Sequence, residues 1–374
     1  MSVNTIKMFL HRYIRIVFLF FVISVTCIFL IAQPFSPNTK KQATGSDGLF
    51  DSDEILEIRL QGDLRQVLNN REDNKKKFPI TLSYKTGEVI SDEISIKAST
   101  RGHFRLLREN CNYPPLLLHF TKASNIKSTP FSEQRKLKLV MPCKDDDYLM
   151  GEWLTYRIYN LVTPLSFRAR LVKVTIDDSR SKKTSTAFYG ILIEEEDQLA
   201  SRNNMNSVKT QLLPQQLDTE SFLRMAVFQY LIGNTDWSIQ YLQNIKLLTT
   251  SKLPRPIPVP YDFDHAGIVN APYALPAEEL RMSSIRERRY RGFCIEDLSA
   301  YDSVLVFYNG LKDKIYDLFN SCTLISDRYR RSTITFLDDF YKTINNPKTW
   351  QRDFAYPCDK NGTGNVVIKG LKED

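Results

Sequence analysis

Apolar positions in the first half of the chain follow the pattern of β-strands. Six segments of six to eight residues are either apolar or alternate between apolar and polar residues, which is typical of strands that bury one or both faces. They are residues 78–84, 93–100, 115–120, 136–142, 169–176 and 186–193. Residues 145–162 differ, because Leu149, Trp153 and Tyr156 lie on one helical stripe that follows three aspartates. This stretch predicts one helix among the strands.

After residue 195 the apolar spacing lengthens to three and four residues, which predicts helices. Segment 218–234 begins at Asp218, a residue type that caps helices, and it is apolar nearly all round. We therefore expect it to be a buried helix. Segments 296–319 and 332–344 also repeat apolar residues at helical spacing. The pattern thus predicts an α+β protein, with a strand-rich N-lobe at 54–196 followed by a helical C-lobe at 197–374.

The N-terminal residues predict a membrane segment. Residues 16–32 are uncharged and apolar, and the preceding residues 1–15 carry a basic flank. A run of this length reaches the short end of the roughly 17–25 residues that span a bilayer. Because the basic flank comes first, we expect a single-pass anchor with a cytoplasmic N-terminus, an exported main domain and a polar linker at 33–53. A cleaved signal peptide is the alternative, and it would give a secreted or periplasmic protein.

Composition narrows the choice of partners and metals. The 374 residues are 42% hydrophobic and 25% charged, as expected of a globular protein with a core. The net charge of +8 is modest for this length, and no nucleic-acid-binding motif is present, so we expect no nucleic-acid partner. The cysteines form no CxxC pair, which argues against a zinc site. In an exported chain Cys111–Cys143 and Cys294–Cys322 are candidate disulfides, with free buried thiols as the alternative.

Candidate chemistry gathers between residues 233 and 267. The predicted buried helix ends near Gly233, and Asp236 follows in a short loop. Asn244 then opens a strand at 244–248, and a return strand at 257–261 leads into Asp262 and Asp264. The ends of an antiparallel pair are adjacent, so the hairpin should bring these side chains together. Alternatively, they are ordinary turn, cap and solvated residues.

This set of residue types suits phosphoryl transfer. One carboxylate can position or deprotonate the accepting hydroxyl, while an amide oxygen and a second carboxylate can hold Mg²⁺ against nucleotide phosphates. Carboxylate and amide oxygens are the hard ligands that Mg²⁺ prefers. The pattern therefore predicts ATP and Mg²⁺ as ligands of the hairpin.

The segments "NTDWSIQYLQNIKLL" (234–248) and "IPVPYDFD" (257–264) resemble the CotH-like (spore-coat protein H type) kinases, which are exported proteins of atypical kinase fold. "FYGILIEEEDQLASR" (188–202) is similar to the strand of that family that ends in a glutamate before the second lobe, and "STRGHFR" (99–105) matches its first lobe more loosely. The resemblance covers roughly residues 90 to 270. It implies an atypical two-lobed protein-kinase-like fold.

The resemblance also implies roles for single residues. Asp236 would be the catalytic acid or base, with Asn244 and Asp262 as metal ligands and Asp264 as a supporting ligand. Glu194 or Glu196 would mark the lobe junction near the adenine.

Contacts to the nucleotide phosphates depart from the family pattern. Pro114 and Pro115 stand where the family has a phosphate-binding lysine, and no glycine-rich loop is evident. Lys138, paired with Glu152, is the candidate substitute, and Lys136 on the same strand face is the alternative. Arg101 and Arg105 are further candidates for phosphate contact.

The most consistent interpretation is a membrane-tethered kinase that transfers phosphate from ATP to a hydroxyl of a protein or small-molecule acceptor. Two alternatives remain. An apolar strand followed by Asp-x-Asp also begins phosphohydrolases of the haloacid-dehalogenase type, although these do not need Asp236. A non-catalytic pseudokinase or envelope scaffold would keep the fold without transfer.

Overall fold

The computed structural model describes residues 48–355, apart from 73–75, 88, 92, 123, 125, 144 and 182. These residues belong to one compact unit, Ser46–Asp374. The predicted basic flank at 1–15 and membrane segment at 16–32, and most of the linker, lie outside the described residues. Within the described part of the chain, no helix combines the length and apolarity needed to cross a bilayer.

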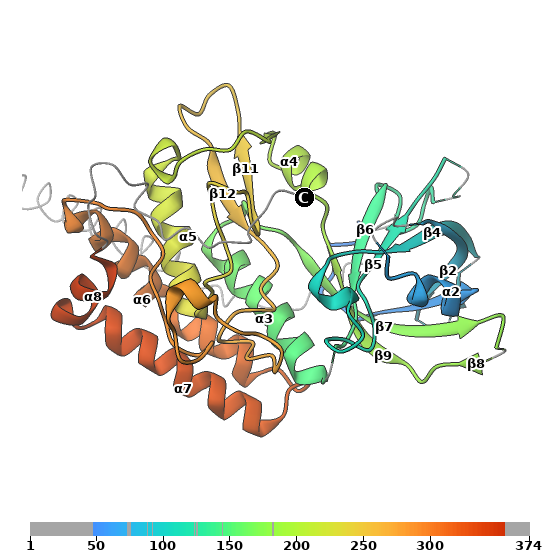
Figure 1. Ribbon diagram of the computed structural model, residues 1–374. Helices are drawn as coiled ribbons and strands as arrows, with labels where there is room; N and C mark the ends of the chain where they lie inside the picture. Colours follow the sequence, from blue (N-terminus) through green and yellow to red (C-terminus); the bar gives the residue numbers. More distant parts are fainter. Residues whose placement is uncertain are drawn as a thin grey trace, which may run out of the picture. The chain divides into compact units, whose positions relative to one another are not determined.

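Most strands belong to one large sheet (Figure 1). Its neighbours run in the order β1-β2-β4-β5-β6-β9-β7-β8, and β3 pairs with β2. All six strand segments predicted from the sequence contain a strand of this sheet, so those predictions are confirmed. The strands are β1 (Leu56–Gly62), β2 (Phe78–Thr86), β3 (Val89–Ile90), β4 (Ile94–Thr100), β5 (Leu116–His119), β6 (Lys136–Val140), β7 (Ala169–Asp178), β8 (Lys183–Thr184) and β9 (Phe188–Ile193).

The sheet closes on itself through β1. This strand pairs antiparallel with β2, where Leu60 faces Leu82, and parallel with β7, where Leu60 faces Ile176. Seven strands therefore form a ring, with β3 and β8 as additions. The expected two-lobed protein-kinase-like fold is wrong, because the strand-rich region is a closed sheet within one compact unit. The strand list drawn from the sequence omits β1, and without β1 the sheet stays open.

A hydrophobic core fills the closed sheet and fixes which strand faces point outward. Leu60, Leu82, Leu118 and Leu137 are completely buried in one cluster. Successive side chains of a strand point to opposite faces. Because Leu137 and Leu139 belong to this cluster, Lys138 lies on the other face of β6. The sheet thereby presents Lys138 toward the helical part of the chain.

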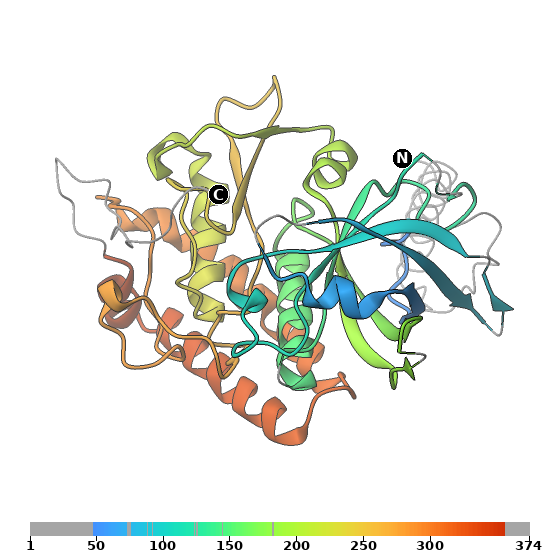
Figure 2. The ribbon, with the colours of Figure 1, turned by 45° about the vertical axis from the view of Figure 1, so that its right-hand side comes forward.

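The helices predicted from apolar spacing are present. The helical elements are α2 (Leu64–Asn69), α3 (Asp146–Val162), α4 (Glu196–Arg202), α5 (Thr219–Ile232), α6 (Asp302–Asn320), α7 (Asp327–Ile344) and α8 (Pro347–Phe354), with short 3₁₀ turns η1 (Phe104–Leu106), η2 (Pro214–Gln216), η3 (Glu278–Leu280) and η4 (Leu298–Tyr301). The carboxylate of Asp218 accepts a hydrogen bond from Ser221 N and caps α5, as expected. In both ribbon views α3 lies between the closed sheet and the helices α5, α6 and α8 (Figure 2). It packs on β7 and β9 and on α5 and α6.

The predicted hairpin is confirmed. A small second sheet contains β10 (Asn206–Val208), β11 (Ile245–Thr249) and β12 (Ile257–Pro260), in that order. In the antiparallel register of β11 and β12, Ile245 faces Pro260. One residue further, Tyr261 N donates to Asn244 O at 3.0 Å. The end of β12 and the start of β11 are therefore neighbours, as the sequence predicts.

One predicted disulfide is confirmed and the other is wrong. Cys111 is bonded to Cys143. Cys294 is also disulfide-bonded, but not to Cys322, which is a free cysteine. Sequence spacing alone does not distinguish between partners.

Gly151 lets α3 pack closely on α7. A Cβ atom at Gly151 would overlap the hydroxyl of Tyr329, which donates to Ile268 O at 2.9 Å. We expect Gly151→Ala to lower the free energy of unfolding by about 1–3 kcal/mol, as overpacked core substitutions do. The matched change Gly310→Ala in α6 meets open space. It should stabilise the protein by about 0.5–1 kcal/mol through helix propensity. Chemical denaturation of both variants checks this contrast, and equal effects would contradict it.

Candidate functional site

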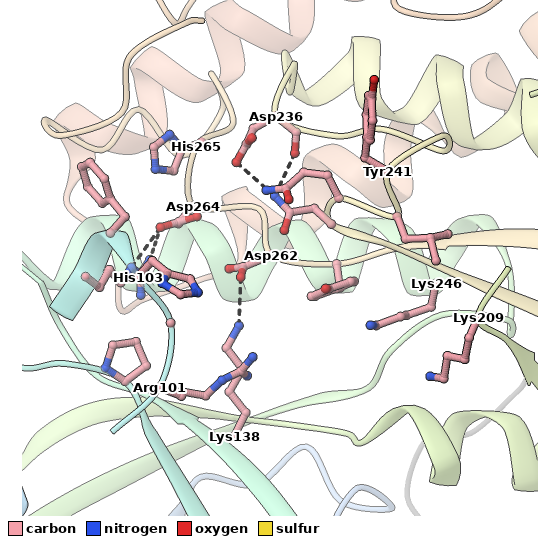
Figure 3. Close-up of a pocket in the computed structure, with 18 of the residues that line it drawn as sticks. Arg101, His103, Lys138, Lys209, Asp236, Tyr241, Lys246, Asp262, Asp264 and His265 are labelled. Atoms are coloured by element: carbon pink, nitrogen blue, oxygen red, sulfur yellow. Dashed lines mark hydrogen bonds and ion pairs between the residues drawn. The ribbon is translucent and has the colours of Figure 1, made fainter. Parts of the chain in front are cut away.

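A cavity of about 590 Å³ lies between the closed sheet and the β11–β12 hairpin (Figure 3). Its lining includes five cationic side chains and three carboxylates. The cations are Arg101, Arg105, Lys138, Lys209 and Lys246, and the carboxylates are Asp236, Asp262 and Asp264. The excess of positive charge suits an anionic ligand, because a cleft lined by one sign of charge concentrates ligands of the other sign.

Asp236 and Asn244 contact each other directly. After α5 ends at Gly233, which has a φ of 65°, Asn234 Oδ1 accepts a hydrogen bond from Asp236 N at 2.9 Å and fixes the turn. The Asn244 side-chain amide donates to the Asp236 carboxylate at 3.0 Å and to the Asp236 backbone oxygen at 2.8 Å. These bonds use the Nδ2 hydrogens of Asn244 and leave its Oδ1 available to a ligand.

Asp262 follows β12 at the same end of the hairpin at which Asn244 precedes β11. The backbone N–H of Asp262 donates a hydrogen bond to the hydroxyl of Tyr156, on α3, at 3.0 Å. Asn244 and Asp262 have φ values of 51° and 61°. Asparagine and aspartate tolerate this left-handed conformation better than most residues, but it still stores strain, and such residues are concentrated at functional sites. The conformation turns both side chains into the cavity.

Lys138, on β6 of the large sheet, reaches the Asp262 side chain. Its Nζ lies 3.2 Å from Asp262 Oδ2, across the boundary between β6 and the hairpin. Burial acts to raise the pKa of Asp262, but the positive charges of Lys138, Arg105 and Arg101 outweigh it and lower this pKa to about 2. Burial also lowers the pKa of Lys138, against the attraction of Asp262. Asp262 is therefore a carboxylate throughout the physiological range.

Asp264 belongs to a separate buried network centred on Arg105. Arg105 Nε donates to Asp264 at 2.9 Å, and Arg105 Nη2 donates to Glu152 at 3.0 Å and to the Tyr273 hydroxyl at 2.8 Å. Tyr273 in turn donates to Asp264 at 3.2 Å. Arg105 is thus held by acids of the chain itself, and Asp264 is already hydrogen-bonded twice through one oxygen.

Glu152 contacts the cavity residue Arg105, and one of its two carboxyl oxygens lacks a hydrogen-bond partner among the described residues. This oxygen is Oε1, and Glu152 is 1% exposed. Burial raises its pKa to about 7, against the attraction of Arg105, and the charges of Asp264 and Asp262 add to the effect of burial. One guanidinium faces two buried carboxylates here, which favours a retained proton on Glu152.

This raised pKa predicts a pH-dependent stability. The folded chain retains the Glu152 proton above the ordinary pKa of 4.5, whereas the unfolded chain releases it. The stabilising contribution of Glu152 is therefore complete below pH 4.5 and is lost as the pH rises toward 7. We expect Glu152→Gln to remove the part of the stability loss between pH 4.5 and 7 that comes from the Glu152 proton. Urea unfolding of both proteins from pH 4 to 8 checks it, and parallel curves would contradict it.

Asp236 is the carboxylate best placed to accept a proton. Burial raises its pKa, and the negative charges of Asp264 and Asp262 raise it further, while His265 and Arg291 act in the opposite direction. A raised pKa makes a carboxylate a stronger base. Among the residues that the structure describes, Asp236 forms no ion pair with a lysine, in contrast to Asp262.

The three consecutive glutamates 194–196 have three different environments. Glu194 is fully buried away from the cavity lining and binds Arg168 at 2.9 Å and Arg202 at 2.8 Å. Burial raises the pKa of Glu195, while the positive charge of Arg101 acts to lower it. Glu196 bridges two lysines at the far end of the cavity, Lys209 and Lys246. Of the two acids considered for the lobe junction, Glu196 is the one that contacts cavity residues.

The structure therefore brings together most of the residues singled out from the sequence. Asp236, Asn244, Asp262, Asp264, Lys138 and Arg101 all line the cavity. Lys136 is exposed, and Glu152 pairs with Arg105 instead of Lys138. Sequence reasoning missed Lys246 and Tyr156, yet each carries a signal. Lys246 is two residues from Asn244 on a strand, and Tyr156 is one helical turn from Glu152.

Comparison with known proteins gives no assignment. No protein-family model matches the chain, and no curated protein matches it. The resemblance to CotH-like kinases therefore stays a prediction, and the geometry of the cavity carries the functional argument.

The oxygen ligands of the cavity suit Mg²⁺ only in a mode that uses few protein ligands. No cluster of three or more His, Cys, Asp or Glu side chains that could hold a metal occurs among the residues that the structure describes. Mg²⁺ commonly uses only one or two protein carboxylates and completes its shell with waters and substrate phosphates. Asn244 Oδ1 and the Asp262 oxygen that does not face Lys138 fit that mode. Asp264 fits less well, because Arg105 and Tyr273 already engage it.

Proposed function

We propose that this protein binds a nucleoside triphosphate such as ATP, together with Mg²⁺, and transfers the terminal phosphoryl group to a hydroxyl of a protein or small-molecule acceptor. The observation that carries the proposal is the β11–β12 hairpin, which gathers Asp236, Asn244 and Asp262 opposite Lys138 in one cavity. Phosphoryl transfer depends mainly on positioning and electrostatic stabilisation, and these residues supply both.

The cations supply the first requirement, which is to hold the phosphates. Lys138 and Arg101 lie at the Asp262 end of the cavity (Figure 3). An ammonium binds phosphate as a point charge, and a guanidinium binds it through two parallel hydrogen bonds. Because Lys138 is buried and close to Asp262, it is fixed before the ligand arrives. Such preorganisation reduces the entropy cost of binding.

Asp236 supplies the second requirement, which is to accept a proton. The acceptor oxygen forms a bond to the terminal phosphorus as its proton passes to the Asp236 carboxylate. The bond between that phosphorus and the bridging oxygen breaks, and the nucleoside diphosphate leaves with the electron pair. Asn244 keeps the carboxylate oriented through its amide hydrogen bond.

Bound Mg²⁺ would neutralise the phosphate charge. Asn244 Oδ1 and Asp262 are the residues of this chain that would hold it. The ion pair with Lys138 and the lowered pKa of Asp262 keep this side chain anionic, which supports that role.

A binding protein without transfer is the second candidate function. Asp262 and Asp264 are both paired with cations of the chain itself, Lys138 and Arg105. Because these two cations are already paired, the cavity could bind a nucleotide through its other cations without reacting with it. This candidate shares the ligand of the first and differs only in whether Asp236 accepts a proton.

We further propose that the protein acts outside the cytoplasm as a membrane-tethered domain. The predicted anchor at 16–32 motivates this location, and the Cys111–Cys143 disulfide and the disulfide at Cys294 support it. Disulfides persist mainly in oxidising compartments.

Transfer of label from γ-phosphate-labelled ATP tests the main proposal. The full chain is incubated with Mg²⁺ and a panel of protein and small-molecule hydroxyl acceptors, and label on any acceptor or on the chain itself is measured. We expect labelling to be lost in Lys138→Met and retained in Lys136→Met, since Lys136 lies exposed on the same strand. ATP binding without any labelling favours the second candidate. If the chain shows no ATP binding and no labelling, both candidate functions are contradicted.

A further inference from the structure

A second cavity, of about 260 Å³, is surrounded by arginines and shares no lining residue with the main cavity. The four arginines come from different elements: Arg157 lies on α3, Arg168 just before β7, Arg170 on β7 and Arg202 on α4. Arginine gathers in this way where planar, bidentate recognition of carboxylate or phosphate is needed. We name this feature the arginine cavity.

Three of the four guanidinium groups are held in place by buried or backbone partners. The carboxylate of Glu194 is inaccessible to solvent and binds Arg168 and Arg202 at 2.9 and 2.8 Å. Arg170 donates to the backbone oxygens of Leu49 and Glu54 at 2.7 and 3.1 Å. These three guanidinium groups are therefore positioned before any ligand binds.

Its remaining partners are exposed acids from the segment 49–54, which runs past the cavity. Asp53 accepts two hydrogen bonds from Arg157, at 2.5 and 2.7 Å. Asp51 accepts one from Arg168 at 2.9 Å. The two aspartate side chains are 71% and 55% exposed. Exposed ion pairs contribute only about 0–1 kcal/mol each, so an external anion can replace them at little cost.

We propose that the arginine cavity is a binding site for a phosphate monoester or phosphate dianion, and that Asp51 and Asp53 act as its internal competitors. The bidentate contact of Asp53 with Arg157 has the geometry that a phosphate would use. With Asp51, Asp53 and Glu54 in place beside Glu194, four arginines face four carboxylates. Displacement of the two aspartates leaves Glu194 and Glu54 as the acids among these groups, and the net charge of +2 then suits a dianion. The proposal is independent of the function proposed for the main cavity.

Titration calorimetry with inorganic phosphate on the full chain tests the site. Asp51→Asn combined with Asp53→Asn removes the competitors, and we expect phosphate to bind about tenfold more tightly than to the unmodified chain, in line with the loss of two exposed pairs. Adding Arg157→Gln should abolish the gain. Asp177→Asn is the matched control, because Asp177 pairs with Arg59 on the surface at 3.4 Å, and it should leave the affinity unchanged.

Two further arms separate this site from the main cavity and identify the source of the phosphate. The gain should persist in Lys138→Met, because Lys138 does not line the arginine cavity. Vesicles of phosphatidic acid, compared with phosphatidylcholine, replace inorganic phosphate in the second arm. A gain with phosphate assigns a soluble ligand, and a gain with phosphatidic acid alone assigns a lipid headgroup. No gain in either arm, or a gain that survives Arg157→Gln, overturns the proposal.

Discussion

Replacing Asp236 with asparagine is expected to lower the rate of phosphoryl transfer by about 10²–10⁴-fold, the usual contribution of a general base. Asparagine has nearly the same shape and keeps an oxygen for the hydrogen bond from Asn244, but it cannot accept the proton of the acceptor. The raised pKa of Asp236, caused first by burial, makes it a stronger base than Asp262, whose pKa is lowered. The loss should appear in kcat, with KM for ATP nearly unchanged.

Two controls make this result specific. The affinity of Asp236→Asn for ATP should remain that of the unmodified chain, since Lys138 and Arg101 are intact. Asp297→Asn serves as the matched exposed control, because Asp297 caps η4 and does not line the cavity. A variant with unaltered kcat would remove Asp236 from the mechanism. Lost ATP affinity with unaltered kcat would instead assign it to binding.

Arg105→Met is expected to lower the free energy of unfolding by about 3–5 kcal/mol, the usual cost of removing one partner of a buried ion pair. Arg105 is the shared donor for Asp264, Glu152 and Tyr273. Its side chain is 10% exposed, and that of Glu152 is 1% exposed. Without Arg105, the Asp264 carboxylate loses its buried cationic partner, and Glu152, which favours its protonated form, loses its hydrogen-bond donor. Denaturant unfolding at pH 7 measures the loss.

The cause of this loss can be separated from the lost packing. Adding Asp264→Asn to Arg105→Met removes the carboxylate that is left without its partner, so we expect part of the stability to return. Arg59→Met is the surface control, because Arg59 is about half exposed and pairs with Asp177 at 3.4 Å. It should change stability by less than about 1 kcal/mol. No recovery in the double variant would show that the cost lies in packing and not in charge.

The β11–β12 hairpin could be predicted from the sequence because its information is local. Asp236, Asn244, Asp262 and Asp264 lie within 29 residues, and the turn between the strands is short. Antiparallel register then brings the ends together whatever the rest of the chain does. Strand alternation limits the candidate phosphate-contacting lysine to Lys136 or Lys138, and Lys138 is the one beside Asp262. Its contact with phosphate stays a prediction.

The Arg105 network and the closure of the sheet could not be predicted, because they depend on contacts between residues that are distant in sequence. Arg105 and Asp264 are 159 residues apart, and Arg105 looked like one of many surface arginines. The closure of the sheet rests on β1 and β7, whose paired residues lie more than 110 positions apart. Strand patterns give the faces of a strand but not its neighbours. The two-lobed kinase-like fold was therefore drawn from resemblance, and the pairing of β1 with β7 contradicts it.

We propose that the main cavity binds Mg²⁺ and a nucleoside triphosphate through Asp262. Titration calorimetry of ATP, with and without Mg²⁺, into the full chain and into Asp262→Asn tests it most directly. We expect Mg²⁺ to strengthen ATP binding to the unmodified chain and to have no such effect on Asp262→Asn, while the Asp297→Asn control behaves like the unmodified chain. ATP binding that is absent, or that responds to Mg²⁺ equally with and without the Asp262 carboxylate, would contradict it.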